Sequence, residues 1–456
     1  MKSSGRGWLS MALVCAGLLA PAARAEDLLS LYRSALTDSP QLRARDLGRA
    51  RAAADADVAR SKLYPQVSVQ TSMSRNEYNA HYTARTLTEN YAGNRTVLSA
   101  RQALLDMASV YRLRGSEAVV TQAEKEAEQA RAELFGQLVD QYLNALQAQD
   151  ELLQLQVEIE AAERQVDRLR AMREREMATV TDLAEAIAWR QQLATREIDA
   201  RNKADAARVR LREVTGRDPG ELATLAIHDF PAVPGTESGW VEAVLSQNAM
   251  VAARRAAVDA GARATDAARA EHLPQLSLSL QHNRSNQNTD FSPLNYSYEI
   301  NSVGLDLVIP IYEGGRVSAS TASALAQLAI ANEQLEASRR EVERDTRLLY
   351  ASASADRARI DSTTAEVDAL AYTVRAQLRC YELGVVTVIH VLDARRRLLR
   401  SRVDQAKARY DYLRDLIGLK LRAGLTEADV AEFNRWLAPR DTQGSLTDMV
   451  EQLSAQ

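Results

Sequence analysis

Two long stretches of this chain, residues 137–215 and 316–383, contain neither glycine nor proline. Uninterrupted runs of this length are uncommon outside coiled coils and long helical bundles. Because a helix rises about 1.5 Å per residue, a run of about 65 residues predicts a rod about 100 Å long. Apolar residues also recur at intervals of seven, the spacing of a coiled-coil seam. They are Leu328, Leu335, Val342 and Leu349, then Ile360, Val367, Val374 and Tyr381, and on the returning helix Leu392, Leu399, Ala406 and Leu413.

Each rod has to turn back on itself at a tip. The candidate tips are 177–182 and 383–387, where β-branched residues weaken the helix and Gly384 suits a left-handed helix end. We expect both tips to lie at the same end of the molecule.

The chain reads as a tandem duplication of one unit. An alanine- and arginine-rich helix is predicted at 39–62 in the first copy and at 248–271 in the second. A proline–glutamine pair follows each helix, at Pro65 and Pro274, and proline favours an extended chain before it. The pair therefore predicts the end of a helix and the start of a strand.

Apolar and polar residues alternate after each proline, which predicts strands with one apolar and one polar face. The predicted order in each copy is strand, polar loop and second strand: 66–74, 75–95 and 96–105, then 275–281, 282–295 and 296–309. The apolar residues of the last strand change parity, so a bulge is expected near Asn301 or Ser302.

The first residues resemble a secretory signal. Lys2 and Arg6 precede an apolar stretch at 8–20, and small residues end at Ala25 before a predicted cleavage site. No later run of about 20 apolar residues exists, so any membrane-spanning part must consist of strands. Periplasm, exterior and outer membrane remain as compartments.

Charge and composition exclude several functions. Removing residues 1–25 takes away three basic and no acidic side chains, so the formal charge goes from −4 to −7 and nucleic acid is not an expected partner. Cys380 would be the single thiol of the mature chain, and the five histidines lack metal-ligand spacing. No nucleophile, phosphate loop or acid–base cluster accompanies the carboxylates. The sequence predicts no enzyme, no metal and no cofactor.

Two strand pairs per chain cannot close a membrane barrel, because the smallest such barrels have about eight strands. An open sheet would leave unpaired backbone groups in lipid. Several chains must therefore share one barrel, and the strand count alone leaves two or three chains open.

Several motifs, in order along the chain, resemble the TolC-like outer-membrane factor family. They are Glu26-Asp27-Leu28-Leu29-Ser30, Ala35-Leu36, Ser39-Pro40, the two proline–glutamine strand starts, Leu104-Leu105-Asp106, Pro310-Ile311-Tyr312-Glu313-Gly314-Gly315, Val391-Leu392-Asp393-Ala394 and Ala408-Arg409-Tyr410. The resemblance covers the mature chain up to about residue 440. No single motif is diagnostic, but the ordered set is specific.

The resemblance implies an α+β membrane protein, a homotrimer whose β-barrel (four strands per chain) continues into a long α-helical coiled-coil tunnel in the periplasm. The implied division is a signal peptide at 1–25, a first repeat at 26–215, an equatorial linker at 216–240, a second repeat at 241–423 and a C-terminal equatorial segment and tail at 424–456. Within the repeats, strand pairs are expected at about 66–105 and 275–310, and helical hairpins at about 107–215 and 315–423.

The family implies contact with outer-membrane lipid, a periplasmic adaptor protein and an inner-membrane ABC or other transporter. The residues before Cys15, Ala12-Leu13-Val14, do not resemble a lipoprotein cleavage box. This unlipidated start resembles the exporters of large proteins and favours type I protein secretion, with small-molecule efflux as the alternative. A periplasmic adaptor would have one helical hairpin rather than two, and a soluble coiled-coil scaffold would not explain the alternating strands. Outer-membrane fractionation separates these hypotheses.

The resemblance also assigns candidate residues at the tips. His390 and Asp393 are three residues apart and match the family's periplasmic selectivity ring, in which His390 replaces a second aspartate. Imidazole ordinarily titrates near pH 6.5, so the ring is expected to respond to pH if these residues face the lumen rather than pack between helices.

Other tip residues match family positions that tie helices together or meet the adaptor. Asp182 and Tyr381 match residues that tie neighbouring helices, although Val386 stands where the family has an arginine. The expected adaptor-docking residues are Glu176, Met177, Gly384 and Val385, and Glu176 replaces a glycine. The arginines near the tips have two open interpretations, a solvated helix face or a docking role: Arg170, Arg173, Arg175, Arg395, Arg396, Arg397 and Arg400.

Overall fold

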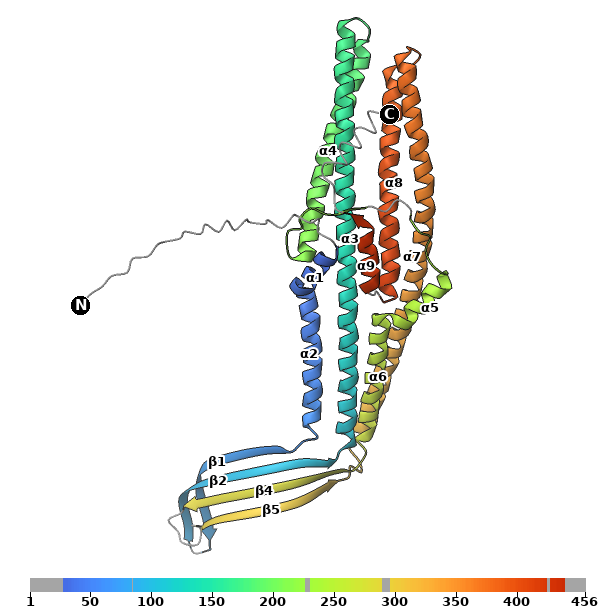
Figure 1. Cartoon of the computed structure of the whole chain (residues 1–456). Coiled ribbons are helices and arrows are strands. Elements are labelled where there is room, and N and C mark those ends of the chain that lie inside the picture. Colours follow the sequence, from blue (N-terminus) through green and yellow to red (C-terminus); the bar gives the residue numbers. More distant parts are fainter. Residues whose placement is uncertain (1–27, 84, 226–229, 289–295, 425–426, 439–456) are drawn as a thin grey trace, which may run out of the picture.

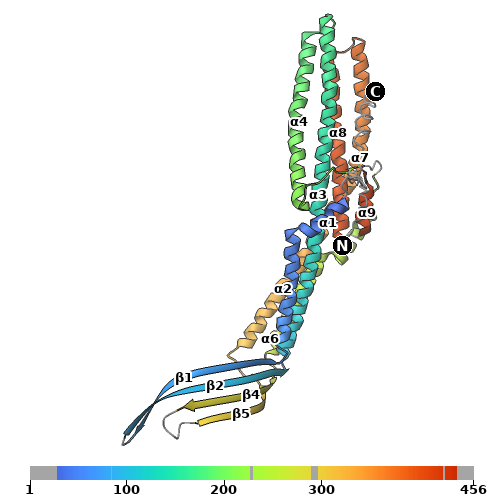
Figure 2. The ribbon, with the colours of Figure 1, turned by 60° about the vertical axis from the view of Figure 1, so that its left-hand side comes forward.

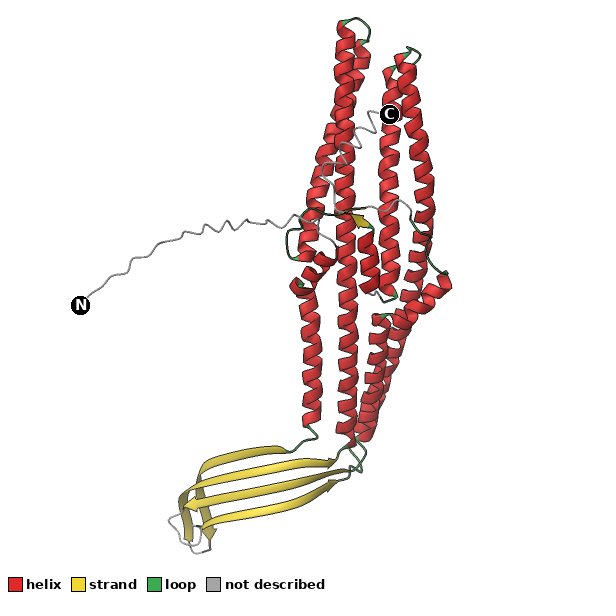
Figure 3. Ribbon diagram, in the orientation of Figure 1, coloured by secondary structure: helices red, strands yellow, loops and turns green. Residues whose placement is uncertain are grey.

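The computed structural model of the 456-residue chain describes residues 28–83, 85–225, 230–288, 296–424 and 427–438. The predicted signal at 1–25 lies outside these residues. Long helices form a rod, and one four-stranded sheet lies at one end of it (Figures 1 and 3). The mixed helix-and-strand fold class is confirmed.

The same order of two helices, two strands and two helices occurs twice along the described chain. The first copy contains α1 (Leu28–Asp38), α2 (Pro40–Ser61), β1 (Gln66–Tyr82), β2 (Arg85–Leu105), α3 (Met107–Glu174) and α4 (Val180–Thr215). The second contains α5 (Glu237–Gln247), α6 (Ala249–Ala270), β4 (Gln275–Asn288), β5 (Tyr296–Val308), α7 (Arg316–Glu382) and α8 (Val388–Arg422). The short strand β3 (Thr224–Leu225) lies between the copies, and α9 (Glu427–Arg435) and β6 (Leu437–Ala438) follow the second.

Helices α2 and α6 begin with equivalent caps. The Ser39 hydroxyl accepts a hydrogen bond from the Leu42 amide at 3.3 Å, and the Asn248 side chain accepts one from the Val251 amide at 3.2 Å. Such caps satisfy amides that have no partner within the helix. The predicted helices at 39–62 and 248–271 are confirmed, with their end residues acting as caps.

The sheet is antiparallel with the order β1-β2-β4-β5, and its strands are longer than predicted. The predicted loop at 75–95 is wrong, because β1 continues to Tyr82 and pairs with β2 up to Arg85. Residues 282–288 of the other predicted loop belong to β4, and residues 289–295 lie outside the described residues. Polar cross-strand bonds support these extensions, for example Thr88 donating to Asn79 at 2.6 Å.

The bulge predicted near Asn301 or Ser302 is also wrong. Strands β4 and β5 pair without a register shift, and His282 lies opposite Asn301 with a side-chain contact of 2.7 Å. The parity change along β5 therefore occurs without an inserted residue. The described irregularity lies in the β2–β4 ladder, between Ala103 and Leu105.

The two faces of the sheet differ in polarity. Val67 and Leu305 on the apolar face are 66% and 67% exposed, whereas Ser277 and Ser285 on the polar face are 6% and 5% exposed. The sheet curls at the end away from the helices (Figure 1). Because a curled sheet crowds its concave side, the low exposure of Ser277 and Ser285 identifies the polar face as the concave one. A single chain therefore leaves a convex apolar surface open to its surroundings.

The two longest helices, α3 and α7, contain 68 and 67 residues, which corresponds to about 100 Å each. The hairpins α3–α4 and α7–α8 extend in the same direction, and both tips lie at the end opposite the sheet (Figures 1 and 2). The heptad residues on α7 and α8 are buried or half-buried, which confirms the predicted seam. Among the described helices, none combines the length and the apolar character needed to span a bilayer.

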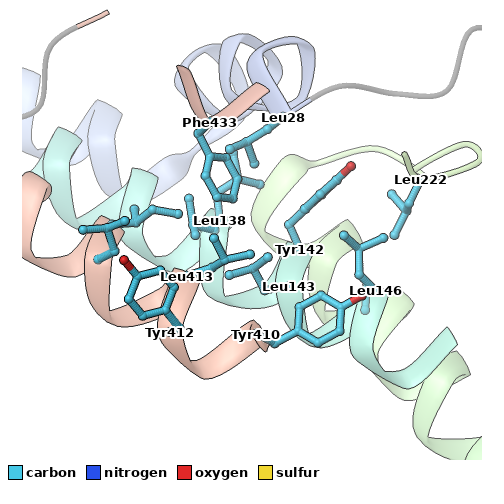
Figure 4. Packing of buried hydrophobic residues seen from close by; sticks show 14 of the residues in the cluster. Leu28, Leu138, Tyr142, Leu143, Leu146, Leu222, Tyr410, Tyr412, Leu413 and Phe433 are labelled. Atoms are coloured by element: carbon cyan, nitrogen blue, oxygen red, sulfur yellow. The ribbon is translucent and has the colours of Figure 1, made fainter. Parts of the chain in front are cut away.

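The largest apolar core lies near the middle of the rod, where both copies contribute side chains. Figure 4 shows Leu138, Tyr142 and Leu143 of α3 packed close to Leu413 of α8, and all four side chains are fully buried. The segment between the copies and the C-terminal segment meet beside this core, because β3 pairs with β6. The core therefore fixes the two hairpins to each other well away from the tips.

Candidate functional site at the helical tips

The first tip joins α3 to α4. The Glu176 amide donates to the Arg173 carbonyl and the Met177 amide to the Met172 carbonyl, both at 2.9 Å. This is the bonding pattern of a helix that ends on a left-handed residue. Glu176 has a φ of 56° and is the one non-glycine residue with positive φ among the described residues, a conformation that costs about 1 kcal/mol for a residue with a Cβ atom.

The second tip, between α7 and α8, ends in the same way. The Gly384 amide donates to the Tyr381 carbonyl and the Val385 amide to the Cys380 carbonyl, both at 2.9 Å. Gly384 has a φ of 74°, which glycine adopts without steric cost. Glu176 and Gly384 are therefore structurally equivalent, and each is followed by an exposed apolar residue, Met177 or Val385.

The structure brings Asp182 and Tyr381 near each other across the two hairpins. The Asp182 carboxylate accepts from the Thr179 hydroxyl at 2.6 Å and from the Thr179 amide at 3.3 Å. Burial raises the pKa of the Tyr381 phenol, the Asp182 charge raises it further, and the Arg168 charge lowers it. Within the described contacts, charge rather than a hydrogen bond links Asp182 to Tyr381.

His390 and Asp393 lie in the first turns of α8, and both are exposed in the single chain. The His390 amide donates to the Thr387 carbonyl at 3.2 Å. The nearest charged partner of Asp393 is not His390 but Arg396, whose Nη1 lies 3.7 Å from the Asp393 Oδ1. This contact places a permanent positive charge beside the carboxylate of the candidate ring.

A groove of about 740 Å³ runs between α3, α4 and α8 beside Asp393. Its wall includes Trp189, which is 1% exposed. The Arg396 guanidinium lies 5.0 Å and the Arg196 guanidinium 5.9 Å from the centre of the Trp189 ring, both within cation–π range. Charged side chains of both signs line the rest of this groove: Glu151, Asp199, Lys203, Arg397, Arg400 and Asp404.

A second contact, between two charged side chains, joins the same two hairpins. Arg395 of α8 lies 3.4 Å from Glu158 of α3, and their side chains are 20% and 16% exposed. Burial raises the pKa of the Glu158 carboxyl, while the Arg395 charge opposes the rise. Such half-buried pairs hold helices in one register, because separating them would leave both charges poorly solvated.

Sequence reasoning did not single out Trp189 and left the roles of the α8 arginines open. The structure separates these arginines: Arg395 and Arg396 contact the first hairpin, whereas Arg400 is 88% exposed. A tryptophan shortly after a tip, in a rod with few aromatic residues, was the available signal. Its partner lies 207 positions away, so no local pattern could identify it.

Comparison with known proteins agrees with this architecture. The family model described as "Outer membrane efflux protein" matches residues 31–217 and 240–425, so this chain belongs to that family. The two matched segments correspond to the two copies of the repeated fold. The protein is an outer-membrane channel-tunnel protein with a periplasmic helical part.

Two curated relatives span nearly the whole chain. The outer membrane protein TolC of Vibrio cholerae is 28% identical over 439 residues, covering 92% of this chain and 96% of the relative. The alkaline protease secretion protein AprF of Pseudomonas aeruginosa is 28% identical over 429 residues, covering 91% and 88%. The solved structure of CusC matches with a TM-score of 0.77 at 18% identity, over 88% of this chain and 92% of CusC, which shows the shared fold alone.

Proposed function

We propose that three copies of this chain form one conduit across the outer membrane and periplasm, and that the conduit exports cargo. The observation that carries a barrel shared between copies is the sheet with its two open edges, and the number three rests on the resemblance to TolC-like channels. In the order β1-β2-β4-β5, the outer edges of β1 and β5 have no partner strand among the described residues. Three copies arranged head to tail would supply twelve strands and close every edge.

The chain direction of the edge strands supports this closure. All three neighbouring pairs in the sheet are antiparallel, so β1 and β5 are antiparallel to each other. The β5 strand of one copy would therefore continue the same pattern with β1 of the next. The exposed apolar convex face would meet outer-membrane lipid.

Exposed apolar residues on the rods support the same assembly. Ile198 and Val209 of α4 are 70% and 65% exposed, and Leu348 and Tyr372 of α7 are 61% and 68% exposed. Helices with apolar residues on their outer faces bury them against partners. Packing of α4 of one copy against α7 of the next would complete a helical tunnel below the barrel.

For the cargo, we propose type I protein secretion, with an inner-membrane ABC transporter and a periplasmic adaptor delivering a polypeptide to the tips. The support is a relative named for alkaline protease secretion that spans most of this chain. Small-molecule efflux is the second candidate, favoured by the description of the family. Glu176, Met177, Gly384 and Val385 would meet the adaptor, because they are the outermost residues of both tips.

At the entrance, His390 and Asp393 would form a ring around the threefold axis, and Asp182 with Tyr381 would help to hold the hairpins together. Three carboxylates brought close together attract cations. Ion selectivity in planar bilayers tests the role of Asp393 in this ring: Asp393→Asn should lower the preference for cations.

Native mass spectrometry of the mature protein, purified from outer membranes in detergent, tests the assembly. A trimer is expected, and a dominant monomer would contradict it. Export tests the cargo: deletion of the gene should abolish appearance of a co-encoded secreted polypeptide in the medium while leaving resistance to small toxic compounds unchanged. The reverse result would favour the efflux function.

A further inference from the structure

The contact between Trp189 and Arg396 joins the two hairpins near the tips. Trp189 lies on α4 and Arg396 on α8, and the guanidinium carbon is 5.0 Å from the ring centre. The Trp189 indole nitrogen and the Arg396 Nε are both buried without a hydrogen-bond partner among the described residues. The face of the Trp189 ring is therefore the group of the first hairpin that the Arg396 guanidinium contacts.

The same arginine reaches the candidate selectivity residue. Its Nη1 lies 3.7 Å from the Asp393 Oδ1, and the side chains of Arg396 and Asp393 are 36% and 60% exposed. The Arg396 guanidinium thus lies over the face of the Trp189 ring, and its Nη1 is directed at the Asp393 carboxylate. An arginine keeps its charge at any physiological pH, so its effect on Asp393 does not depend on titration.

We propose that Trp189 holds Arg396 in a position where it offsets the charge of Asp393, and that this pair sets the ion selectivity of the entrance. Trp189 and Arg396 are positioning residues for Asp393, and the role of Asp393 itself rests on the proposed channel. The ring then attracts cations less strongly than three free carboxylates would.

The surrounding charges do not replace Arg396. On α8, Arg397 contacts the backbone carbonyl of Asp393 at 3.5 Å rather than its carboxylate. Arg400 lies 4.0 Å from Asp404. From α3 and α4 the groove receives Glu151, Arg196, Asp199 and Lys203, and Lys203 lies 3.4 Å from Glu151.

Reversal potentials of the purified protein in planar bilayers under a KCl gradient test the proposal. Arg396→Gln is expected to raise the ratio of potassium to chloride permeability about twofold or more. Asp393→Asn should lower the ratio, and Arg396→Gln should add little in the Asp393→Asn background. Trp189→Phe keeps the core filled but weakens the cation–π contact, so it should shift the ratio in the same direction as Arg396→Gln by a smaller amount.

Arg400→Gln is the matched control, because it removes the same charge from the same helix one turn away. Its shift should be smaller than that of Arg396→Gln and should persist in the Asp393→Asn background. Equal shifts for the two arginine variants, no shift for Arg396→Gln, or a full Arg396→Gln shift without Asp393 would each overturn the inference. If the wild-type protein forms no channels at all, the proposed function fails as well; normal channels with unaltered selectivity in Arg396→Gln would refute this inference alone.

Discussion

The two hairpins follow one plan but begin their helices differently. In the first hairpin both helices have side-chain caps: Asp106 accepts from the Ser109 amide at 3.0 Å, and Thr179 with Asp182 forms a reciprocal capping box. In the second hairpin, the cap residues are Gly315 before α7 and Thr387 before α8, and neither forms a side-chain cap bond.

The C-terminal ends of α3 and α7 also differ, but here the first hairpin is the less favourable one. The first tip holds Glu176 in a left-handed conformation, whereas the second uses Gly384. The first tip therefore combines a capping box with backbone strain, and the second has neither. The two copies of a duplicated fold can therefore share one geometry while their helix ends differ in stability. The start of α8, which lacks a capping box, should open more easily than the start of α4.

The largest expected effect comes from the residue that joins the hairpins. Trp189→Ala should destabilise the tip region by about 3–5 kcal/mol, because it empties a fully buried site. Hydrogen exchange of peptides from α4 and α8 should accelerate together. Trp240→Ala, in α5 far from the tips, is the control and should leave tip exchange unchanged. Faster exchange in α4 alone would show that Trp189 does not couple the hairpins.

Removing the hydroxyls of the two threonines that precede α4 and α8 tests the difference in capping between the two tips. Thr179→Ala should cost about 1 kcal/mol at the first tip, because the hydroxyl accepts from the Asp182 amide at 3.1 Å. Thr387→Ala should cost at most a few tenths of a kcal/mol, because this hydroxyl caps nothing. Hydrogen-exchange rates of the amides in the first turns of α4 and α8 measure both losses of stability. Equal losses at the two tips would contradict the comparison.

Relief of the backbone strain at Glu176 should stabilise the first tip. Glu176→Gly is expected to slow exchange around the first tip by an amount equivalent to about 1 kcal/mol, since glycine adopts positive φ freely. Gly384→Ala is the reciprocal change and should destabilise the second tip by a similar amount. A loss of stability in Glu176→Gly would mean that the glutamate side chain contributes more than its backbone costs.

His390 occupies the position in α8 that Asp182 occupies in α4, three residues after the cap threonine. His390→Asp should therefore create a capping box with Thr387 and stabilise the start of α8 by about 0.5 kcal/mol. His390→Asn is the control for loss of the imidazole. Exchange at the α8 start should slow in His390→Asp relative to His390→Asn, and no difference would show that this tip cannot form the box.

The smallest expected effect is a pH dependence in the second hairpin. Burial raises the pKa of Asp415, and Asp356 and Asp411 raise it further, whereas a hydrogen bond from Ser352 lowers it. A carboxyl whose pKa is raised by folding contributes stability below its ordinary pKa and loses that contribution as pH rises through the folded value. Lowering the pH from neutrality through the raised pKa of Asp415 towards its ordinary value should therefore favour the folded state through this group. Asp415→Asn should flatten this part of the melting-temperature profile, whereas Asp167→Asn, an exposed carboxylate, should not.

Local signals in the sequence were sufficient where a structural feature depends on neighbouring residues. Ser39 and Asn248 marked helix starts, Pro65 and Pro274 marked strand starts, and the positions of both tips followed from the break in helical pattern. These signals work because caps, proline and glycine act on the backbone within a few residues.

The strand lengths were not predictable in the same way. Residues 75–82 of β1 are polar and lack apolar alternation, so the sequence suggested a loop. They extend the sheet because β2 supplies backbone and side-chain hydrogen bonds, such as that between Thr88 and Asn79. A strand defined by its partner cannot be recognised from one chain segment.

The repeated plan of rods, strands and tips follows from the amino-acid sequence, because heptads, alternation and helix breakers are local patterns. Which charges meet near the tips depends instead on how the helices pack. Trp189 and Arg396 contact each other because α4 and α8 pack together, and that packing also places Arg396 beside Asp393. The neighbours of a side chain on a long helix depend on which helix lies beside it and in what register, and this is a property of the packed hairpins.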